Sequence, residues 1–181
     1  MTTNIGLLRE IRNNEVELML SWRNAPNVRA NMYTHHEISL SEHLTWWERT
    51  KKNKHHHYFM YEHHSVPLGI VALTEIDLIA KSSSWAFYAA PGAPTGTGSK
   101  MEFLTLDYAF DTLGLQALDC EVLSFNIPVL KLHEKFGFQV VETVKNGHNT
   151  GSQYYDIYKL QLTASDWKHF RPLMLKRVEQ R

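Results

Sequence analysis

The feature that most constrains the fold is a strand, a glycine-rich loop and a helix that follow one another between residues 82 and 114. The strand-like run "SSSWAFYAA" ends at Pro91, and "PGAPTGTGS" is the segment richest in Gly and Pro. The next segment, "KMEFLTLDYAFDTLG", distributes its apolar residues as a helix does and stops at Gly114. A second strand-like run, "ALDCEVLSF", follows. The pattern therefore predicts a βαβ crossover and one parallel strand pair.

The rest of the chain supplies further strands and helices around this crossover. Asn14 is expected to cap a first helix, and Ser39 with Glu42 has the spacing of a capping box for a second. The other expected elements are strands at 6–11, 57–63, 66–76 and 138–144, a short helix at 127–137, a turn cluster at 146–151 and a last strand at 153–162. This order predicts a three-layer α/β sandwich around a mixed, mostly antiparallel sheet.

The length of 181 residues suits one domain, which we place at residues 1–162. Residues 163–181 form a basic tail with helical propensity, and Pro172 is expected to interrupt it. The sequence leaves two roles open for this tail, packing on the sheet or forming a homodimer.

The composition disfavours several classes of function. Nineteen Lys and Arg residues balance nineteen Asp and Glu residues, which disfavours nucleic acid and anionic membranes as partners. No run of about 18 apolar residues and no signal peptide is evident, so a cytoplasmic protein is expected. Cys120 is the single cysteine and is expected to be a small buried hydrophobe. The eleven histidines lack recurring ligand spacing, so no metal site is expected.

The glycine loop before the helix at about residue 97 is a candidate anion site. Gly96 and Gly98 allow close backbone approach to a bound group, and a helix start offers free amide N–H groups. A pyrophosphate suits such a site. The loop lacks the Lys of a Walker A motif, and Met101 stands where G-x-G-x-x-G needs its last glycine. A plain connecting loop is the alternative interpretation.

A second helix start lies in the stretch "EVLSFNIPVLKLHEKFGF". Asn126 is placed to cap a helix that begins near Pro128, and His133 follows two helical turns later on the same face. If the two helix starts lie over neighbouring parallel strands, a ligand can bind in the crevice beyond the ends of those strands.

The two stretches "TGTGS" and "NIPVLKLHEKFGF" resemble the motifs of the GNAT family of acetyl-CoA-dependent N-acetyltransferases, and the element order agrees over almost the whole chain. The resemblance implies acetyl-CoA as cosubstrate. Ala93 stands where the family loop usually begins with Gln or Arg. The residues that the resemblance assigns to coenzyme A are Phe87, Tyr88, Ala89, Gly96, Thr97, Gly98, Ser99 and Asn126.

The resemblance also implies two catalytic residues. His133 occupies the position of the family's general-acid Tyr and, when protonated, can serve as the acid for the leaving thiolate. Glu121 occupies the strand where the family often keeps a basic carboxylate. By alternation it shares a face with Leu123 and Phe125, which would raise its pKa if that face is buried. The alternatives are a surface histidine without a role and a glutamate that faces solvent.

The acceptor region resembles, more narrowly, the UDP-amino-sugar N-acetyltransferases of pseudaminic acid biosynthesis. The matching pieces are "WRN-x-P", "MY", "ISL-x-x-HL" and "FYAAP". The resemblance implies substrate contacts from Arg23, Met32, Tyr33 and His43 and the acceptor UDP-4-amino-4,6-dideoxy-N-acetyl-β-L-altrosamine. A guanidinium suits a diphosphate, and aromatic rings suit uracil and sugar. The alternative interpretation makes Arg23 a surface cation and places Met32 and Tyr33 in the core.

Two other functions stay open at this point. "SWRN" also resembles the branch that acetylates the N-termini of ribosomal proteins. The absence of the usual Tyr at position 133 is compatible with a non-catalytic module that only binds acyl-CoA.

Overall fold

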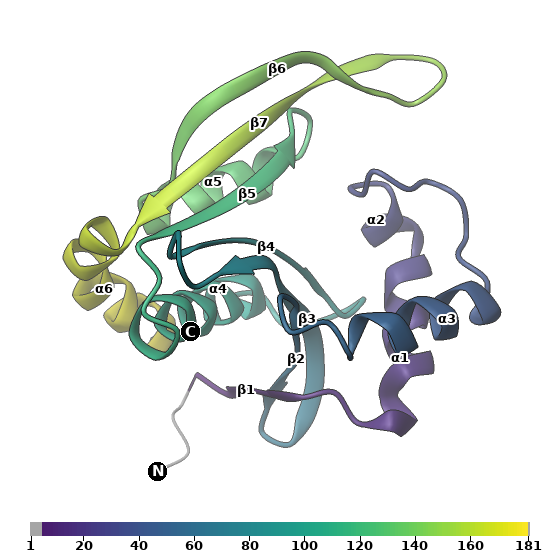
Figure 1. Ribbon diagram of the computed structural model, residues 1–181, viewed down its shortest axis with the longest axis horizontal. Coiled ribbons are helices and arrows are strands. Elements are labelled where there is room, and N and C mark those ends of the chain that lie inside the picture. Colours follow the sequence, from purple (N-terminus) through teal and green to yellow (C-terminus); the bar gives the residue numbers. More distant parts are fainter. Residues whose placement is uncertain (1–4, 181) are drawn as a thin grey trace.

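The computed structural model describes residues 5–180 and contains the predicted crossover (Figure 1). It consists of β4 (Ser82–Ala89), α4 (Thr97–Asp107) and β5 (Ala117–Leu123), with β4 and β5 parallel. A π-helical turn, η2 (Tyr108–Thr112), extends α4. The N-terminal segment, for which we expected no signal peptide, begins with residues 1–4. These four residues lie outside the described residues.

In the described part of the chain, seven strands form one sheet in the order β1-β2-β3-β4-β5-β7-β6. Neighbours other than β4 and β5 pair antiparallel, so the predicted mixed and mostly antiparallel sheet is confirmed. The remaining strands are β1 (Leu7–Glu10), β2 (His57–His63), β3 (Val66–Asp77), β6 (Gln139–Asn149) and β7 (Tyr154–Thr163).

Helices cover the two faces of the sheet, as the alternation of side chains along its strands requires. Met60 and Tyr61 of β2 are both fully buried, but Met60 packs in the cluster with α1 (Val16–Asn24) and α3 (Leu40–Thr50). Tyr61 packs in the larger cluster, which contains residues of α4, α5 (Ile127–Phe136) and α6 (Ala164–Glu179). The three-layer α/β sandwich is therefore present.

The position of α4 depends on a close approach to β3. Gly69 faces Met101 of α4, and a Cβ at Gly69 would lie 2.6 Å from the Met101 Cε atom. The end of the flexible Met101 side chain would have to shift to admit a Cβ, which would also lie 2.9 Å from the backbone oxygen of Tyr88 on β4. The absence of a side chain at Gly69 therefore allows Met101 to pack closely on β3.

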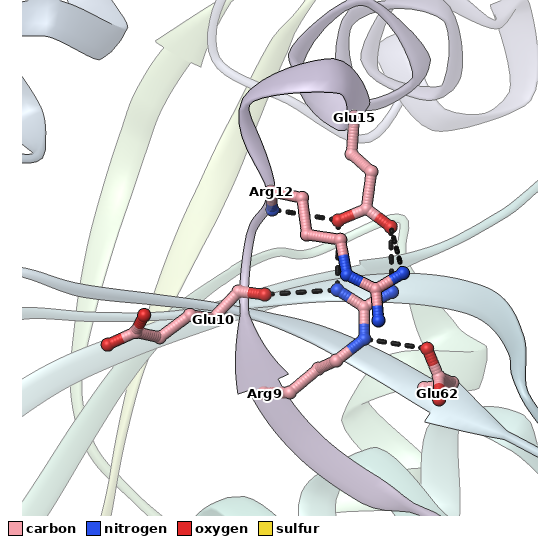
Figure 2. A network of polar contacts seen from close by, with 5 residues as sticks. All are labelled: Arg9, Glu10, Arg12, Glu15 and Glu62. Atoms are coloured by element: carbon pink, nitrogen blue, oxygen red, sulfur yellow. Dashed lines mark hydrogen bonds and ion pairs between the residues drawn. The ribbon is translucent and has the colours of Figure 1, made fainter.

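The N-terminal segment is anchored by an ion-pair network shown in Figure 2. Arg9 of β1 contacts Glu62 of β2 at 2.6 Å and Glu15 at 2.7 Å, and Glu15 accepts a hydrogen bond from the Arg12 amide. Glu15 ends a 3-10 turn, η1 (Asn13–Glu15), which leads into α1. The expected cap at Asn14 is therefore wrong, because the chain already turns through Asn14 and uses Glu15 to bind Arg9.

The second predicted cap is confirmed. The Ser39 hydroxyl accepts a hydrogen bond from the Glu42 amide at 3.2 Å and begins α3. Between α1 and α3 lies the short helix α2 (Pro26–Arg29), followed by a loop that carries Met32 and Tyr33.

The C-terminal tail is a continuous helix, α6, so the expected interruption at Pro172 is wrong. Trp167 is 1% exposed in the main core and donates a hydrogen bond to Asp107 of α4, which also pairs with Arg171 at 2.7 Å. This packing against α4 holds α6 in place although Pro172 removes one backbone donor. The tail therefore belongs to the same core as residues 5–162.

The hairpin of β6 and β7 extends beyond the rest of the sheet and arches toward α2 (Figure 1). The segment 146–149, expected in a turn, belongs to β6 because a register shift between Val144 and His148 lets pairing resume at His148 and Tyr155. Asn146 adopts a positive φ of 53° at this irregularity, and its amide donates to Asp156. The longer strand carries His148 to the tip.

Candidate active site

A cavity opens where the two parallel strands separate. β4 and β5 pair only from Ser82 with Ala117 to Ser84 with Asp119, and beyond this point β4 pairs only with β3. The cavity between the diverging strands has a volume of about 520 Å³. Its wall includes Phe87, Tyr88, Ala89, Gly96, Thr97, Gly98, Cys120, Glu121, Asn126 and His133.

The glycine loop forms one end of the cavity. Gly96 has a φ of +93°, a conformation that favours glycine, and immediately precedes α4. The first turn of α4 leaves amide N–H groups without intrahelical partners, which favours an anion. Ser99 is not part of this wall and lines a separate hollow with Met174 and Arg177 of α6. The structure therefore brings seven of the eight predicted coenzyme A residues to one cavity.

Asn126 stands at the start of α5 and lines the same cavity. It occupies the cap position, but its side chain makes no capping hydrogen bond, in contrast to the expectation. Pro128 in the first turn has no N–H group that needs a cap. The Asn126 side chain is therefore not committed to the helix end.

His133 is buried, with 3% of its side chain exposed, so it is not a surface histidine. Its Nδ1 lies 2.9 Å from Oε1 of Glu102, a fully buried carboxylate of α4. Burial alone would lower the pKa of His133, but the Glu102 carboxylate and a hydrogen bond to Cys120 raise it to about 10. Cys120, expected to be buried, is 5% exposed. Burial also raises the pKa of Glu102, and the contact with His133 opposes this rise, so the His133–Glu102 pair holds a proton at neutral pH.

Glu121 and Tyr33 meet on another wall of the cavity. The Tyr33 hydroxyl donates a hydrogen bond of 2.6 Å to Oε2 of Glu121, and both residues line the cavity. Burial and this bond raise the pKa of Tyr33 above its ordinary value. Glu121 is exposed, which corrects the expectation of a buried carboxylate on an apolar strand face. The helices α1 and α3 cover the face of β2 and β3, whereas Glu121 lies on β5 outside that cover.

The hairpin tip adds a residue that sequence reasoning missed. His148 is 7% exposed, its Nε2 lies 2.7 Å from Nε2 of His35, and its ring packs edge-on against Tyr33. The signal in the sequence was weak, because "NGHNTG" is typical of a turn. The contact connects β6 to the loop that carries Tyr33.

Arg23 and His43 lie outside the cavity wall. His43 is 4% exposed, its Nε2 lies 3.0 Å from the Val16 carbonyl oxygen, and its ring stacks on Trp46. Burial lowers the pKa of His43, which favours a neutral ring in the packing of α3 on α1. This placement is at odds with a substrate contact. Arg23, by contrast, neighbours Tyr88 of the cavity wall.

The chain matches the family model described as an acetyltransferase (GNAT) domain over residues 7–139. It belongs to the GNAT family. The predicted family resemblance is confirmed, and with it an acetyl-CoA-dependent N-acetyltransferase activity.

Relatives of this GNAT enzyme span most of its length. Acetyltransferase PseH from Campylobacter jejuni (strain 81-176) is 26% identical over 159 residues, which cover 88% of this chain and 92% of the relative. The uncharacterized N-acetyltransferase YokL of Bacillus subtilis is 26% identical over 137 residues, 74% of this chain and 76% of its own. The spermidine N-acetyltransferase of Vibrio cholerae, solved with CoA and spermine, superposes with a TM-score of 0.83 at 21% identity, covering 89% and 96% of the two chains.

The cavity of this GNAT enzyme suits its cosubstrate. Within residues 5–180, the edge of β4 beyond Ser84 has no strand partner on the β5 side, so its amide and carbonyl groups are available to a ligand that carries amides. The glycine loop at the end of the cavity suits a pyrophosphate. When acetyl-CoA is bound, it supplies the activated acetyl thioester. Among residues 5–180, no group of three or more potential ligand side chains is positioned for a metal ion.

Proposed function

We propose that the enzyme acetylates the 4-amino group of UDP-4-amino-4,6-dideoxy-N-acetyl-β-L-altrosamine, in cytoplasmic pseudaminic acid biosynthesis. The motifs of the acceptor region support this acceptor, as does the similarity to acetyltransferase PseH over most of both chains. The likeness to the spermidine N-acetyltransferase, at 21% identity, is a likeness of fold. No helix in the described part of the chain is long and apolar enough to cross a membrane.

The main structural support for a nucleotide-sugar acceptor is the unpaired guanidinium group of Arg23. Its Nη1 atom is buried and has no hydrogen-bond partner among the described residues. Burial lowers the pKa of Arg23, and the nearby Arg29 of α2 adds repulsion in the same direction. An unpaired buried guanidinium nitrogen beside a second cation favours an anionic ligand, and a diphosphate offers the oxygens that Arg binds well.

We assign Glu121 as the general base that deprotonates the acceptor amine. This carboxylate lines the cavity and can take the amine proton directly or through a water molecule. Tyr33 donates its hydroxyl hydrogen to one carboxylate oxygen and leaves the other oxygen of Glu121 for the substrate. Met32, also in the cavity wall, provides an adaptable apolar contact.

The leaving thiolate needs a proton, and we assign its donation to His133. The ring lines the cavity and keeps its proton at neutral pH. Backbone amides of the free edge of β4, near Phe87 and Tyr88, are suited to stabilise negative charge on the acyl oxygen.

The test is a thiol-release assay with acetyl-CoA and separate acceptors: a panel of UDP-4-amino sugars, ribosomal-protein N-terminal peptides and spermidine. We expect turnover with the UDP-4-amino-4,6-dideoxy sugar. Turnover confined to peptides would favour the alternative of N-terminal acetylation, and turnover confined to spermidine would overturn the sugar assignment.

Arg23→Ala should raise the KM for the nucleotide sugar by about 10-fold or more, because the diphosphate loses a charged hydrogen bond of about 1.5–3 kcal/mol. The KM for acetyl-CoA should not change. Arg49→Ala, which removes an exposed arginine of α3, is the matched control. An effect of Arg23→Ala confined to acetyl-CoA would contradict the assigned role.

A further inference from the structure

The least expected group near the cavity is a carboxylate inside the core. Glu102 of α4 is 0% exposed and lies among buried apolar neighbours of the same helix, Met101 and Phe103. Its Oε1 contacts Nδ1 of His133 at 2.9 Å, and its Oε2 has no hydrogen-bond partner among the described residues. A charge buried in this way is costly unless it is paired. His133 is the partner that the structure provides.

We propose that Glu102 is a positioning residue that keeps the His133 ring protonated and fixes its orientation, so that this ring can protonate the leaving thiolate at neutral and mildly alkaline pH. The proposal rests on the proposed role of His133 as the proton donor. Among the described residues, His133 lines the cavity and Glu102 does not. Glu102 therefore acts through its contact with His133.

The surroundings of His133 define which groups act on its charge. From β4, Trp85 and Phe87 contribute aromatic rings with centroids 5.3 and 6.0 Å from the imidazole, and Phe138 contributes a third at 5.1 Å. The titratable groups that face the ring are Glu102 from α4 and Cys120 from β5. The aromatic rings carry no charge, so Glu102, the larger influence, and Cys120 offset the effect of burial on the pKa of His133.

The contact also selects the nitrogen that can act. Nδ1 is engaged by Glu102, so Nε2 is the ring nitrogen left to donate a proton to the thiolate. In the transfer, the N–C bond to the acceptor amine forms and the C–S bond of acetyl-CoA breaks. The amine gives its proton to Glu121 or water, and the thiolate takes a proton from Nε2 of His133. The neutral ring then regains a proton from solvent, while the Glu102 carboxylate stays in place.

The first test measures the charge of His133 without any acceptor. We would titrate the 15N-histidine spectrum of the full-length enzyme, and assign the His133 signal by its loss in His133→Gln. The wild-type ring should stay protonated through pH 8. In Glu102→Gln, which keeps the shape and removes the charge, the midpoint should fall by about two pH units or more. Glu134→Gln, an exposed carboxylate on the same helix as His133, is the matched control and should not move it.

The second test follows kcat against pH. In Glu102→Gln, kcat should fall about tenfold for each pH unit above the lowered midpoint, with the KM for acetyl-CoA unchanged, because the fraction of protonated donor declines. Glu102→Asp should restore part of the alkaline activity. A packing role alone would lower kcat equally at all pH values, and that result would overturn the proposal.

Two further outcomes separate this inference from the proposed acceptor. If the UDP-4-amino sugars are not acetylated but the His133 midpoint falls in Glu102→Gln, the acceptor assignment fails and the coupling stands. If the wild-type ring is already neutral at pH 7, the coupling fails, whatever the acceptor. This last measurement needs His133→Gln only to assign the signal, so the inference remains testable even if Glu102→Gln does not fold.

Discussion

At the scale of single residues, the proposed acid and base have contrasting surroundings. His133 is enclosed by aromatic rings and paired with a buried carboxylate, whereas Glu121 is exposed and bonded to the Tyr33 hydroxyl. The enclosed pair favours retention of a proton. The exposed carboxylate can pass its proton to solvent after each turnover. Two ionisable groups in one cavity are thereby suited to opposite proton transfers.

Replacement of His133 by Ala should lower kcat by about 10²-fold or more, because general acid catalysis contributes about that much. The assay is thiol release at saturating acetyl-CoA and acceptor. An unchanged kcat would remove His133 from the mechanism and leave unassisted departure of the thiolate.

Glu121→Gln should lower kcat by about 10²-fold, since the amide cannot accept the amine proton. Glu142→Gln, which removes an exposed carboxylate on β6 that pairs with Lys159, is the control. If a higher pH restores the Glu121→Gln rate to that of the wild type, the carboxylate serves only to deprotonate free amine. If Glu121→Gln and Glu142→Gln lower kcat equally, the loss comes from the change in net charge and not from a role of Glu121 as base.

The raised pKa of His133 also predicts how stability depends on pH. The ring has a pKa of about 10 when folded and about 6.5 when unfolded, so the folded state binds the proton more tightly. Its contribution is fully present below about pH 6.5 and is lost as pH rises toward 10. Urea unfolding should give a free energy of unfolding that declines from pH 6.5 to 8.5. The decline should be smaller in His133→Gln, and an identical decline would contradict the assigned pKa.

At the scale of elements, the acceptor side of the cavity is built from segments far apart in the chain. The loop after α2 carries Tyr33 and His35, β5 carries Glu121, and the tip of the β6–β7 hairpin carries His148 (Figure 1). The contacts among them fix the loop against the hairpin. The cosubstrate side, by contrast, comes from one continuous unit of β4, loop and α4.

Loss of the contact between His148 and His35 should therefore raise the KM for the acceptor more than the KM for acetyl-CoA. His148→Ala removes a hydrogen bond of about 1 kcal/mol, which corresponds to about a fivefold rise in the acceptor KM. Tyr154→Ala, which removes an exposed ring of the same hairpin, is the control. Steady-state kinetics with each substrate varied in turn would give both constants. A rise in the KM for acetyl-CoA alone would show that the hairpin serves the other end of the cavity.

At the scale of the whole molecule, α6 joins the tail to the layer that contains α4. Trp167 packs on Phe103 and Phe136, and Asp107 of α4 binds both Trp167 and Arg171. Trp167→Ala should lower the free energy of unfolding by about 3–5 kcal/mol, as truncation of a buried aromatic ring does. Lys168→Ala, exposed on the same helix, is the control. Equal urea midpoints for both variants would contradict a structural role for α6.

The sequence by itself determined the order of elements, the crossover and the glycine loop. These depend on local signals: apolar periodicity, glycines that break helices, and the capping spacing of Ser39. The tail's place in the core and the strand that holds His148 could not be read in this way. Trp167 finds its partners, and His148 its register, only after distant segments have packed.

The tertiary structure alone decided the environment of each candidate side chain. Glu102 and His133 lie on different helices, 31 residues apart, and Tyr33 meets Glu121 across 88 residues. His43, which the motif places at the substrate, is enclosed between α3 and α1. A local pattern places a residue on a face of its own element. Its burial, partner and charge depend on which other element covers that face.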